Sequence, residues 1–248
     1  MHYKAYFFIS LLIFFACSDE QVGDCFTSVG KIKTEIRTVP SFHSIDANHR
    51  FKITLVQDSI KQGQIELISG EHIIKGYTTE VSDGILKIRN KNKCDIVRAI
   101  QEPKIKIHFW KDLQNLNITS AASCINLGEI RLPMLQILGN STSEIQLTDL
   151  SIDYIGFQLR KSTNLILQGK TIELRGQVNE VSNLYSLDLE AQNVLVDNHT
   201  VLDCYVDATK IIYVNIFNDG HIFYKRSPSE KLELVNGQGK GQLLLYTP

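Results

Sequence analysis

The chain has 248 residues, of which 43% are hydrophobic, and a formal net charge of −1 at pH 7. A chain of this length and apolar content can bury one sizeable core. The near-neutral charge gives no electrostatic basis for binding nucleic acid, which would require a clustered basic face, so no nucleic-acid partner is expected.

Residues 1–16 have the pattern of a signal peptide. Lys4 supplies a positive charge, and residues 6–16 form an apolar run of 11 residues, which is too short to span a bilayer. The run ends in Phe14-Phe15-Ala16-Cys17, which resembles a bacterial lipobox, where the peptide is cleaved before the cysteine and the cysteine is acylated; residue 14 is more often Leu. We expect lipidation at Cys17 and attachment to the membrane through that lipid. The alternative is an ordinary secretory signal with a coincidental cysteine.

The residues that follow Cys17 are polar and are expected to form a tether up to residue 30. Ser18 does not resemble an inner-membrane retention signal. The run Ser18-Asp19-Glu20 resembles the acidic tag that directs lipoproteins to the cell surface in some Gram-negative lineages. We therefore predict an outer-membrane lipoprotein exposed at the cell surface, with a periplasm-facing orientation as the alternative.

Residues 31–112 contain short alternating apolar segments that are typical of strands. The expected strands are 31–37, 42–47, 51–56, 64–69, 85–89 and 104–109. One helical turn is expected within 71–77, a tight hairpin turn at 82–84, and an exposed loop over 91–102. This part is expected to form the first coils or a β-rich cap, because an open end would expose unpaired strand edges.

The stretch from residue 113 to residue 246 contains a repeat with a period of about 20 residues. Pairs of apolar residues open successive segments: Leu116/Ile118, Leu135/Ile137, Ile155/Phe157, Leu174/Val178, Val194/Val196, Ile212/Val214 and Leu232/Leu234. A second set keeps the same period strictly in its first four pairs and continues more loosely: Ile125/Leu127, Ile145/Leu147, Leu165/Leu167, Tyr185/Leu187, Cys204/Val206, Ile222/Tyr224 and Leu243/Leu245. Small and polar residues, suited to turns, lie between the two sets.

This period predicts an all-β parallel β-helix, or β-solenoid, with about 20 residues and two strands per turn. Alternate side chains of each strand would point inward, and stacking of turns would bury them in a continuous column. A spacing of 2 rather than 3 or 4 excludes a helical interpretation. The alternative is an antiparallel sandwich or barrel. Because no linker interrupts the chain, we expect one domain over 31–248, with the cap in 31–112 and the repeats in 113–246.

Four cysteines remain besides Cys17, and an envelope location permits disulfides. Cys124 and Cys204 are expected four turns apart, about 19 Å at roughly 4.8 Å per turn, which is too far for a disulfide. The pairing that we predict is Cys25 with Cys94, which would attach the N-terminus to the loop that contains Cys94. The alternative is that all four are unpaired.

Several segments resemble the putative auto-transporter adhesin, head GIN domain family. They are RTVPSFHSI at 37–45, the strand at 51–56, TEVSDGILKI at 79–88, the strand at 104–108, NDGHIFY at 218–224 and GQGKG at 237–241. The resemblance implies an extracytoplasmic lipoprotein with a β-helical body and no established enzymatic role. The middle turns depart from it: family members often carry Gly-Ser-Gly there, whereas this chain has Ser120-Ala121-Ala122, Asn140-Ser141-Thr142 and Ser162-Thr163-Asn164.

No catalytic, cofactor or metal motif was found in the sequence. The nearest constellation is Asp197, His199, Asp203, Cys204 and Asp207. It would suit a metal site or a Cys–His pair, but a polar turn followed by a strand with an inert, buried Cys204 is the preferred interpretation. The acidic and basic residues that could cleave a polysaccharide do not recur at the same position of the repeat. They are Asp149, Asp153, Arg160, Arg175 and Asp188. We therefore expect neither an enzyme nor a cofactor or metal.

Trp110 is the only tryptophan and a candidate ligand platform, although packing is the preferred interpretation. Outward positions are expected to form a polar strip suited to glycan or protein: Asn117, Gln136, Gln146, Gln158 and Asn215. The function predicted from sequence is a non-enzymatic, lipid-anchored binding or adhesion module for an extracellular glycan or protein. The alternative is a structural component that self-assembles into a homo-oligomer, and a glycan-acting enzyme is the least favoured interpretation.

Overall fold

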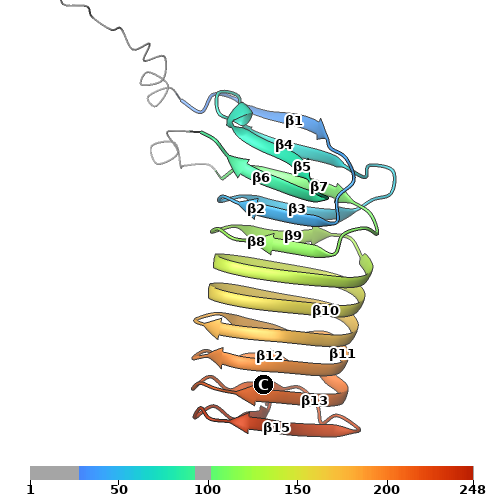
Figure 1. The fold of residues 1–248 in the computed structure, drawn as a ribbon, viewed down its shortest axis with the longest axis vertical. Helices are drawn as coiled ribbons and strands as arrows, with labels where there is room; N and C mark the ends of the chain where they lie inside the picture. The colour runs from blue at the N-terminus through green and yellow to red at the C-terminus, as the bar shows by residue number, and fades with distance from the viewer. Residues whose placement is uncertain (1–27, 93–101, 248) are drawn as a thin grey trace, which may run out of the picture.

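The structure, a computed structural model, describes residues 28–92 and 102–247. The prediction of an all-β protein is confirmed, because sixteen strands of this part of the chain join in one sheet that curls around an apolar core (Figure 1). The single helical turn expected within 71–77 is a 3-10 helix, η2, at Ile74–Gly76.

The strands follow one another closely along the chain. They are β1 (Ile32–Thr38), β2 (Ser44–Asn48), β3 (Lys52–Gln57), β4 (Gln64–Gly70), β5 (Tyr77–Ser82), β6 (Ile85–Asn90), β7 (Lys104–Phe109), β8 (Asn115–Ile118), β9 (Ser123–Leu127), β10 (Ile130–Glu180), β11 (Asn183–Thr200), β12 (Cys204–Val206), β13 (Ala208–Ile216), β14 (Ile222–Tyr224), β15 (Lys231–Gly237) and β16 (Leu243–Leu245). β10 and β11 are long because the backbone stays extended where it bends around the corners of the body (Figure 1).

From β8 onward, each segment pairs in parallel with the segment one turn later in the chain. Leu116 lies beside Ile137, Leu165 beside Leu184, and Tyr185 beside Tyr205. The same parallel pairing continues to the last strands, so successive turns stack on one another (Figure 1).

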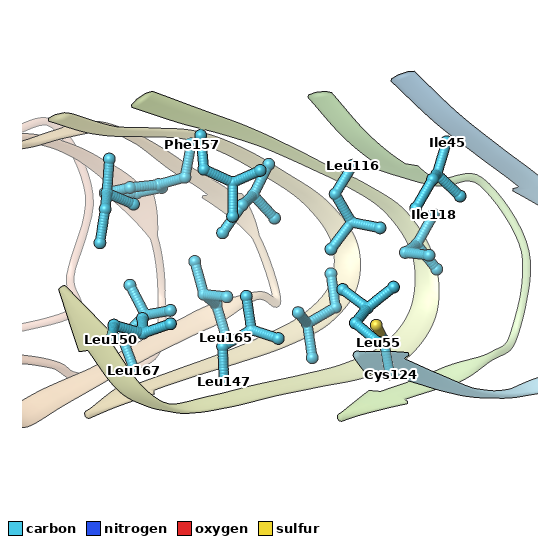
Figure 2. Packing of buried hydrophobic residues seen from close by; sticks show 14 of the residues in the cluster. Ile45, Leu55, Leu116, Ile118, Cys124, Leu147, Leu150, Phe157, Leu165 and Leu167 are labelled. Carbon is cyan, nitrogen blue, oxygen red and sulfur yellow. The ribbon is translucent and has the colours of Figure 1, made fainter. Parts of the chain in front are cut away.

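Each turn contributes one strand to each of two layers. The first layer contains β5, β6, β2, β8, β13 and β15, and the second contains β1, β4, β7, β3, β9, β12, β14 and β16. β10 and β11 contribute to both layers. Figure 2 shows how side chains of the first layer, including Leu116 and Phe157, point toward those of the second, including Leu147 and Leu165. Burial of each such side chain contributes roughly 1.5–3 kcal/mol to the stability of the fold. The alternation of apolar and polar residues therefore determines which face of each strand points inward.

The inward positions of the second layer differ from the prediction in two turns. Ile125 and Tyr185 are exposed, 43% and 41%, instead of buried. The parallel register aligns Cys124 with Ile145 and Leu184 with Leu165, so the buried residues lie one position earlier. The predicted phase was wrong here because the turn from Cys124 to Ile145 is longer than the strict period that the sequence suggested, and the turn from Leu165 to Leu184 is shorter. A shift by a single position moves a strand side chain to the other face.

The expected turns within 139–143 and 161–164 are bends in continuous strand. Lys161 adopts a positive φ of 63°, which changes the chain direction there. The hydroxyl of Thr163 is buried at this corner, where it donates to the carbonyl oxygen of Ser141 at 2.9 Å. Small hydroxyl side chains are therefore inside the corners, where they satisfy backbone groups that the bend leaves unpaired.

The two ends of the body differ. At the N-terminal end β1, β4 and β7 pair antiparallel, and β5 and β6 form the predicted hairpin, with Asp83 and Gly84 at positive φ as a type I′ turn requires. At the C-terminal end β15 and β16 each pair on one side only, with β13 and β14. Leu232 and Leu234 were expected to be inside, but they are 41% and 39% exposed because no turn stacks on theirs.

Candidate ligand-binding surface

Three aromatic side chains occupy the same outward position in three consecutive turns of the second layer. Tyr185 of β11 lies beside Tyr205 of β12, and Tyr205 lies beside Phe223 of β14. The same register adds Ile166 before them and Leu244 after them. We call these five residues the aromatic column. It runs along the stacking direction in the C-terminal half of the body, shown in orange and red in Figure 1.

The three rings form a continuous stack. The ring centroids of Tyr185 and Tyr205 are 5.0 Å apart with planes 8° from parallel, and those of Tyr205 and Phe223 are 5.4 Å apart at 15°. Parallel rings in contact are separated by only about 3.5–4 Å, so each ring is displaced sideways relative to the next, the offset arrangement that aromatic pairs prefer. Tyr185 is 41% exposed, and Tyr205 and Phe223 are partly exposed, so part of each ring is uncovered.

A second row of outward side chains runs parallel to the aromatic column. Asn183, Asp203 and His221 each precede a ring residue by two positions: Asn183 begins β11, and Asp203 and His221 lie directly before β12 and β14. The backbone N–H of His221 donates to Asp203 Oδ1 at 2.9 Å. The ring Nδ1 of His221 accepts a hydrogen bond from the backbone N–H of Gln242 at 3.0 Å. Because Nδ1 is an acceptor, the neutral imidazole carries its proton on Nε2. We call Asn183, Asp203 and His221 the polar column.

The opposite flank of the aromatic column is charged. Lys225 Nζ donates to the carbonyl oxygen of Leu187 at 2.8 Å and lies 3.4 Å from Asp188 Oδ1. The ring of Tyr246 meets Tyr205 edge to face at 5.9 Å. Partial burial, assisted by the negative charge of Asp203, raises the pKa of Tyr205. The phenol of Tyr205 therefore stays protonated and can both donate and accept a hydrogen bond.

The candidate site residues predicted from sequence lie elsewhere. Trp110 follows β7 near the N-terminal end, next to the buried Phe109, and the Lys111 ammonium lies 5.6 Å from its ring centroid. Several turns separate Trp110 from the aromatic column in the sheet order. Cys17, Cys25 and Cys94 lie outside the described residues, so the predicted lipidation and disulfide remain predictions.

The constellation around Cys204 does not form one site. Asp197 accepts a hydrogen bond from Asn215 at 2.8 Å, His199 stacks on Phe217 at 4.3 Å, and Asp207 is held by Arg226. Cys204 and Cys124 are free and buried, and burial raises the pKa of each thiol to about 12. Both thiols are thus inert, as expected for Cys204. Residues 28–92 and 102–247 contain no cluster of three side chains able to hold a metal ion.

The predicted polar strip is divided between the two layers. Gln146 lies beside Ile125 in the second layer, whereas Gln136 lies beside Asn115 in the first layer. Tyr213, beside Leu195 in the first layer, is a partly exposed aromatic residue of the other face. No helix in the described part of the chain is long and apolar enough to cross a membrane.

Sequence reasoning missed the aromatic column, although a signal was present. Tyr185, Tyr205 and Phe223 recur once in each successive turn of the repeat. Tyr185 was assigned to the inward set because it follows Leu165 at the same interval as the earlier pairs of that set. The buried position that aligns with Leu165 is instead Leu184.

The fold and this surface define a protein class: an all-β body built from stacked turns, with an extended row of aromatic side chains on its outer face. The chain belongs to the family described as putative auto-transporter adhesin, head GIN domain, whose model matches residues 41–228.

Solved structures share the fold. A putative adhesin from Bacteroides fragilis NCTC 9343 is similar with a TM-score of 0.78 and 21% identity, over 87% of this chain and 97% of the other. A putative lipid binding protein from Parabacteroides distasonis ATCC 8503 gives a TM-score of 0.64 and 18% identity, over 86% and 97%. A putative adhesin from the same strain gives 0.64 and 14%, over 88% and 98%. No curated protein matches the chain.

Proposed function

We propose that this protein is a lipid-anchored envelope protein that binds an extracellular ligand through the aromatic column. The observation that carries the proposal is the stack of Tyr185, Tyr205 and Phe223 on the outer face of three consecutive turns. Aromatic rings bury a large area at low entropic cost when they are already held in place. A contiguous exposed apolar row on a folded body is typical of an interaction surface.

Adhesion is the biological role that the comparisons favour. The family description and two of the similar structures use the word adhesin. In the proposal the ligand is held without chemical conversion, and it is a glycan or a protein outside the cell.

The architecture proposed for this role is a β-solenoid. The parallel pairing of segments about one turn apart supports it, as does the stacking in Figure 1. In this proposal residues 31–112 form the cap of a single domain over 31–248, and residues 113–246 form the repeats. The antiparallel strands β1, β4 and β7 support the assignment of the cap, because they give the first turns a paired edge.

The anchor and location are further parts of the proposal. Acylation of Cys17 would attach the chain to the outer membrane, and the acidic residues after it favour the cell surface. Treatment of intact cells with an impermeant protease, with a periplasmic protein as control, tests this. Loss of the protein while the control survives is expected, whereas protection of both would place the body on the periplasmic side.

Binding is tested with a variant that removes the three rings, Tyr185→Ala, Tyr205→Ala and Phe223→Ala together, which we call the column variant. Cells that display the wild-type chain are expected to be retained on mucin-coated or fibronectin-coated plates, and cells with the column variant to be lost. Tyr213→Ala, an aromatic residue on the first layer, is the matched control. Circular dichroism checks folding, and Tyr185→Ala alone serves if the triple variant unfolds. Equal retention of wild type and variant, or no retention of wild type on either surface, would contradict the proposal.

A second candidate function is self-assembly through the C-terminal end. Leu232, Leu234, Val235 and Leu245 are exposed there by 39–50%, next to strands with an unpaired edge. Sedimentation velocity would show a concentration-dependent dimer that Leu234→Lys abolishes. A monomer at all concentrations would remove this candidate.

A further inference from the structure

We propose that the ligand of the aromatic column is an extended, neutral glycan that runs along the stacking direction, with one sugar unit at each turn. This inference rests on the proposed function, since it names the ligand chemistry of the same surface. It follows from the pairing of one apolar row with one hydrogen-bonding row at three consecutive turns.

The aromatic column provides the apolar half of such a site. A pyranose ring presents a face of C–H groups and a rim of hydroxyls. The uncovered parts of the Tyr185, Tyr205 and Phe223 rings provide flat apolar area for the C–H face. Because the rings support one another through stacking, little conformational freedom is lost when a ligand covers them.

The polar column provides the hydrogen-bonding half. Sugar hydroxyls both donate and accept, so they pair with side chains of either kind. Asp203 uses Oδ1 for the His221 N–H, which leaves Oδ2 as an acceptor, and His221 retains an Nε2–H donor. Asn183 supplies an amide, and its Oδ1 is buried without a hydrogen-bond partner among the described residues. A buried amide oxygen without a partner requires a donor, and in this proposal a ligand hydroxyl supplies it.

The spacing of the rows matches a linear polymer. Neighbouring turns are about 4.8 Å apart, and the ring centroids are 5.0 and 5.4 Å apart. Sugar units in an extended chain repeat at a similar interval, so successive units meet equivalent pairs of side chains. The pairs are Asn183 with Tyr185, Asp203 with Tyr205, and His221 with Phe223.

The width of the apolar row argues against a helical peptide as the ligand. An amphipathic helix presents an apolar stripe at least 100° wide and docks in an apolar groove. The aromatic column is one residue wide, with the polar column on one side and the Lys225–Asp188 pair and the edge of the Tyr246 ring on the other. A narrow row between two polar flanks suits a ligand that is itself apolar on its face and polar on its rim.

The charges favour a neutral glycan over an acidic one. Asp203 is a carboxylate in the centre of the polar column, and its described partner is a backbone N–H. The Lys225 ammonium, on the other flank, is already paired with Asp188. A glycan carboxylate or sulfate would therefore meet an uncompensated negative charge, whereas a hydroxyl would donate to it.

Isothermal titration with linear β-1,4-linked oligomers of glucose, N-acetylglucosamine and mannose, two to six units long, tests the inference. We expect the affinity for one of these series to rise with each unit up to about five, the number of positions in the aromatic column, and then to level off. Tyr205→Ala is expected to weaken binding roughly tenfold or more, as truncation of a central aromatic contact does. Asp203→Ala is expected to weaken it too, and Tyr213→Ala is expected to bind like wild type.

Binding that does not depend on length, equal binding by Tyr205→Ala, or no binding in any of the three series would overturn the inference. Mild periodate oxidation, which destroys sugar diols and spares most protein, separates this failure from that of the proposed function. If wild-type cells still adhere to oxidised mucin and the column variant does not, the aromatic column binds protein rather than glycan. If the column variant adheres as wild type does before oxidation, the proposed function fails as well.

Discussion

The carbonyl oxygen and ring of Phe157 occupy the space into which a side chain at Gly176 would extend. A Cβ atom at Gly176 would lie 2.1 Å from the Phe157 oxygen and 2.7 Å from its Cδ2. Gly176 aligns with the inward Val196 of the next turn. The turn that follows Phe157 therefore has its apolar pair at Leu174 and Val178, with glycine between them, because the large ring fills the intervening position.

Substitution of Gly176 by Ala is expected to lower the free energy of unfolding by about 1–3 kcal/mol or more, the usual cost of overpacking. Thermal unfolding by circular dichroism measures it. Gly237→Ala is the matched control, because the nearest atom to its Cβ is a flexible Leu234 methyl at 3.3 Å, and a change below about 0.5 kcal/mol is expected. Equal melting temperatures for the two variants would show that the contact with Phe157 does not make a side chain at residue 176 destabilising.

Loss of Arg226 is expected to destabilise the fold through Asp207. The guanidinium makes two hydrogen bonds of 2.7 Å to the carboxylate of Asp207, whose side chain is 2% exposed. Arg226→Met retains the aliphatic stem and leaves a buried charge unpaired, a change that costs about 2–3 kcal/mol once the exposure of the guanidinium is allowed for. In urea titrations the double variant with Asp207→Asn should recover part of this loss, and strictly additive losses would contradict the coupling.

The buried thiols predict a loss of stability in alkali. Burial raises the pKa of Cys124 and Cys204 to about 12, above the value of about 8.5 in an unfolded chain. The folded state therefore favours the protonated thiol, so this contribution is intact below pH about 8.5 and is lost as the pH rises toward 12. The free energy of unfolding should fall less steeply over this range in the Cys124→Ala/Cys204→Ala variant. Parallel pH profiles would contradict the prediction.

The lowered pKa of Glu66 predicts a loss of stability in acid. The Lys106 ammonium, 2.9 Å away, and then the His108 imidazole, 3.0 Å away, lower the pKa of Glu66. Its stabilising contribution is present above the ordinary glutamate pKa of about 4.3 and is lost as the pH falls through the lowered value in the folded state. Glu66→Gln should therefore flatten the decline of the melting temperature below that pH. Glu80→Gln, at an exposed carboxylate, should leave the decline unchanged.

Much of the fold could be predicted because its signals are local. The alternation in Lys104–Phe109 gave the bounds of β7, and Ser82-Asp83-Gly84 gave the hairpin between β5 and β6. Side-chain alternation and turn chemistry act over a few residues and are visible in one sequence.

The inward phase of each turn could not be predicted in the same way. It depends on how many residues the backbone needs to pass each corner. The corner before Tyr185 is one residue short, so the turn from Leu165 to Leu184 is one residue shorter than the average period. A shift of one residue exchanges inside and outside, so Ile125 and Tyr185 were placed on the wrong face. The aromatic column was missed for that reason, since Tyr185, its first ring, was counted as core, and Tyr205 and Phe223 were then not recognised as its continuation.

Each of the three turns that carry Tyr185, Tyr205 and Phe223 adds one residue to the aromatic column and one to the polar column, so the length of this surface is set by the number of such turns. Duplication or deletion of one turn would lengthen or shorten the row by a single position and leave the chemistry of the others intact. The unpaired edge of β15 and β16 is the end at which such growth disturbs least. Evolution could then adjust the strength of attachment by changing the number of turns, without remodelling a pocket.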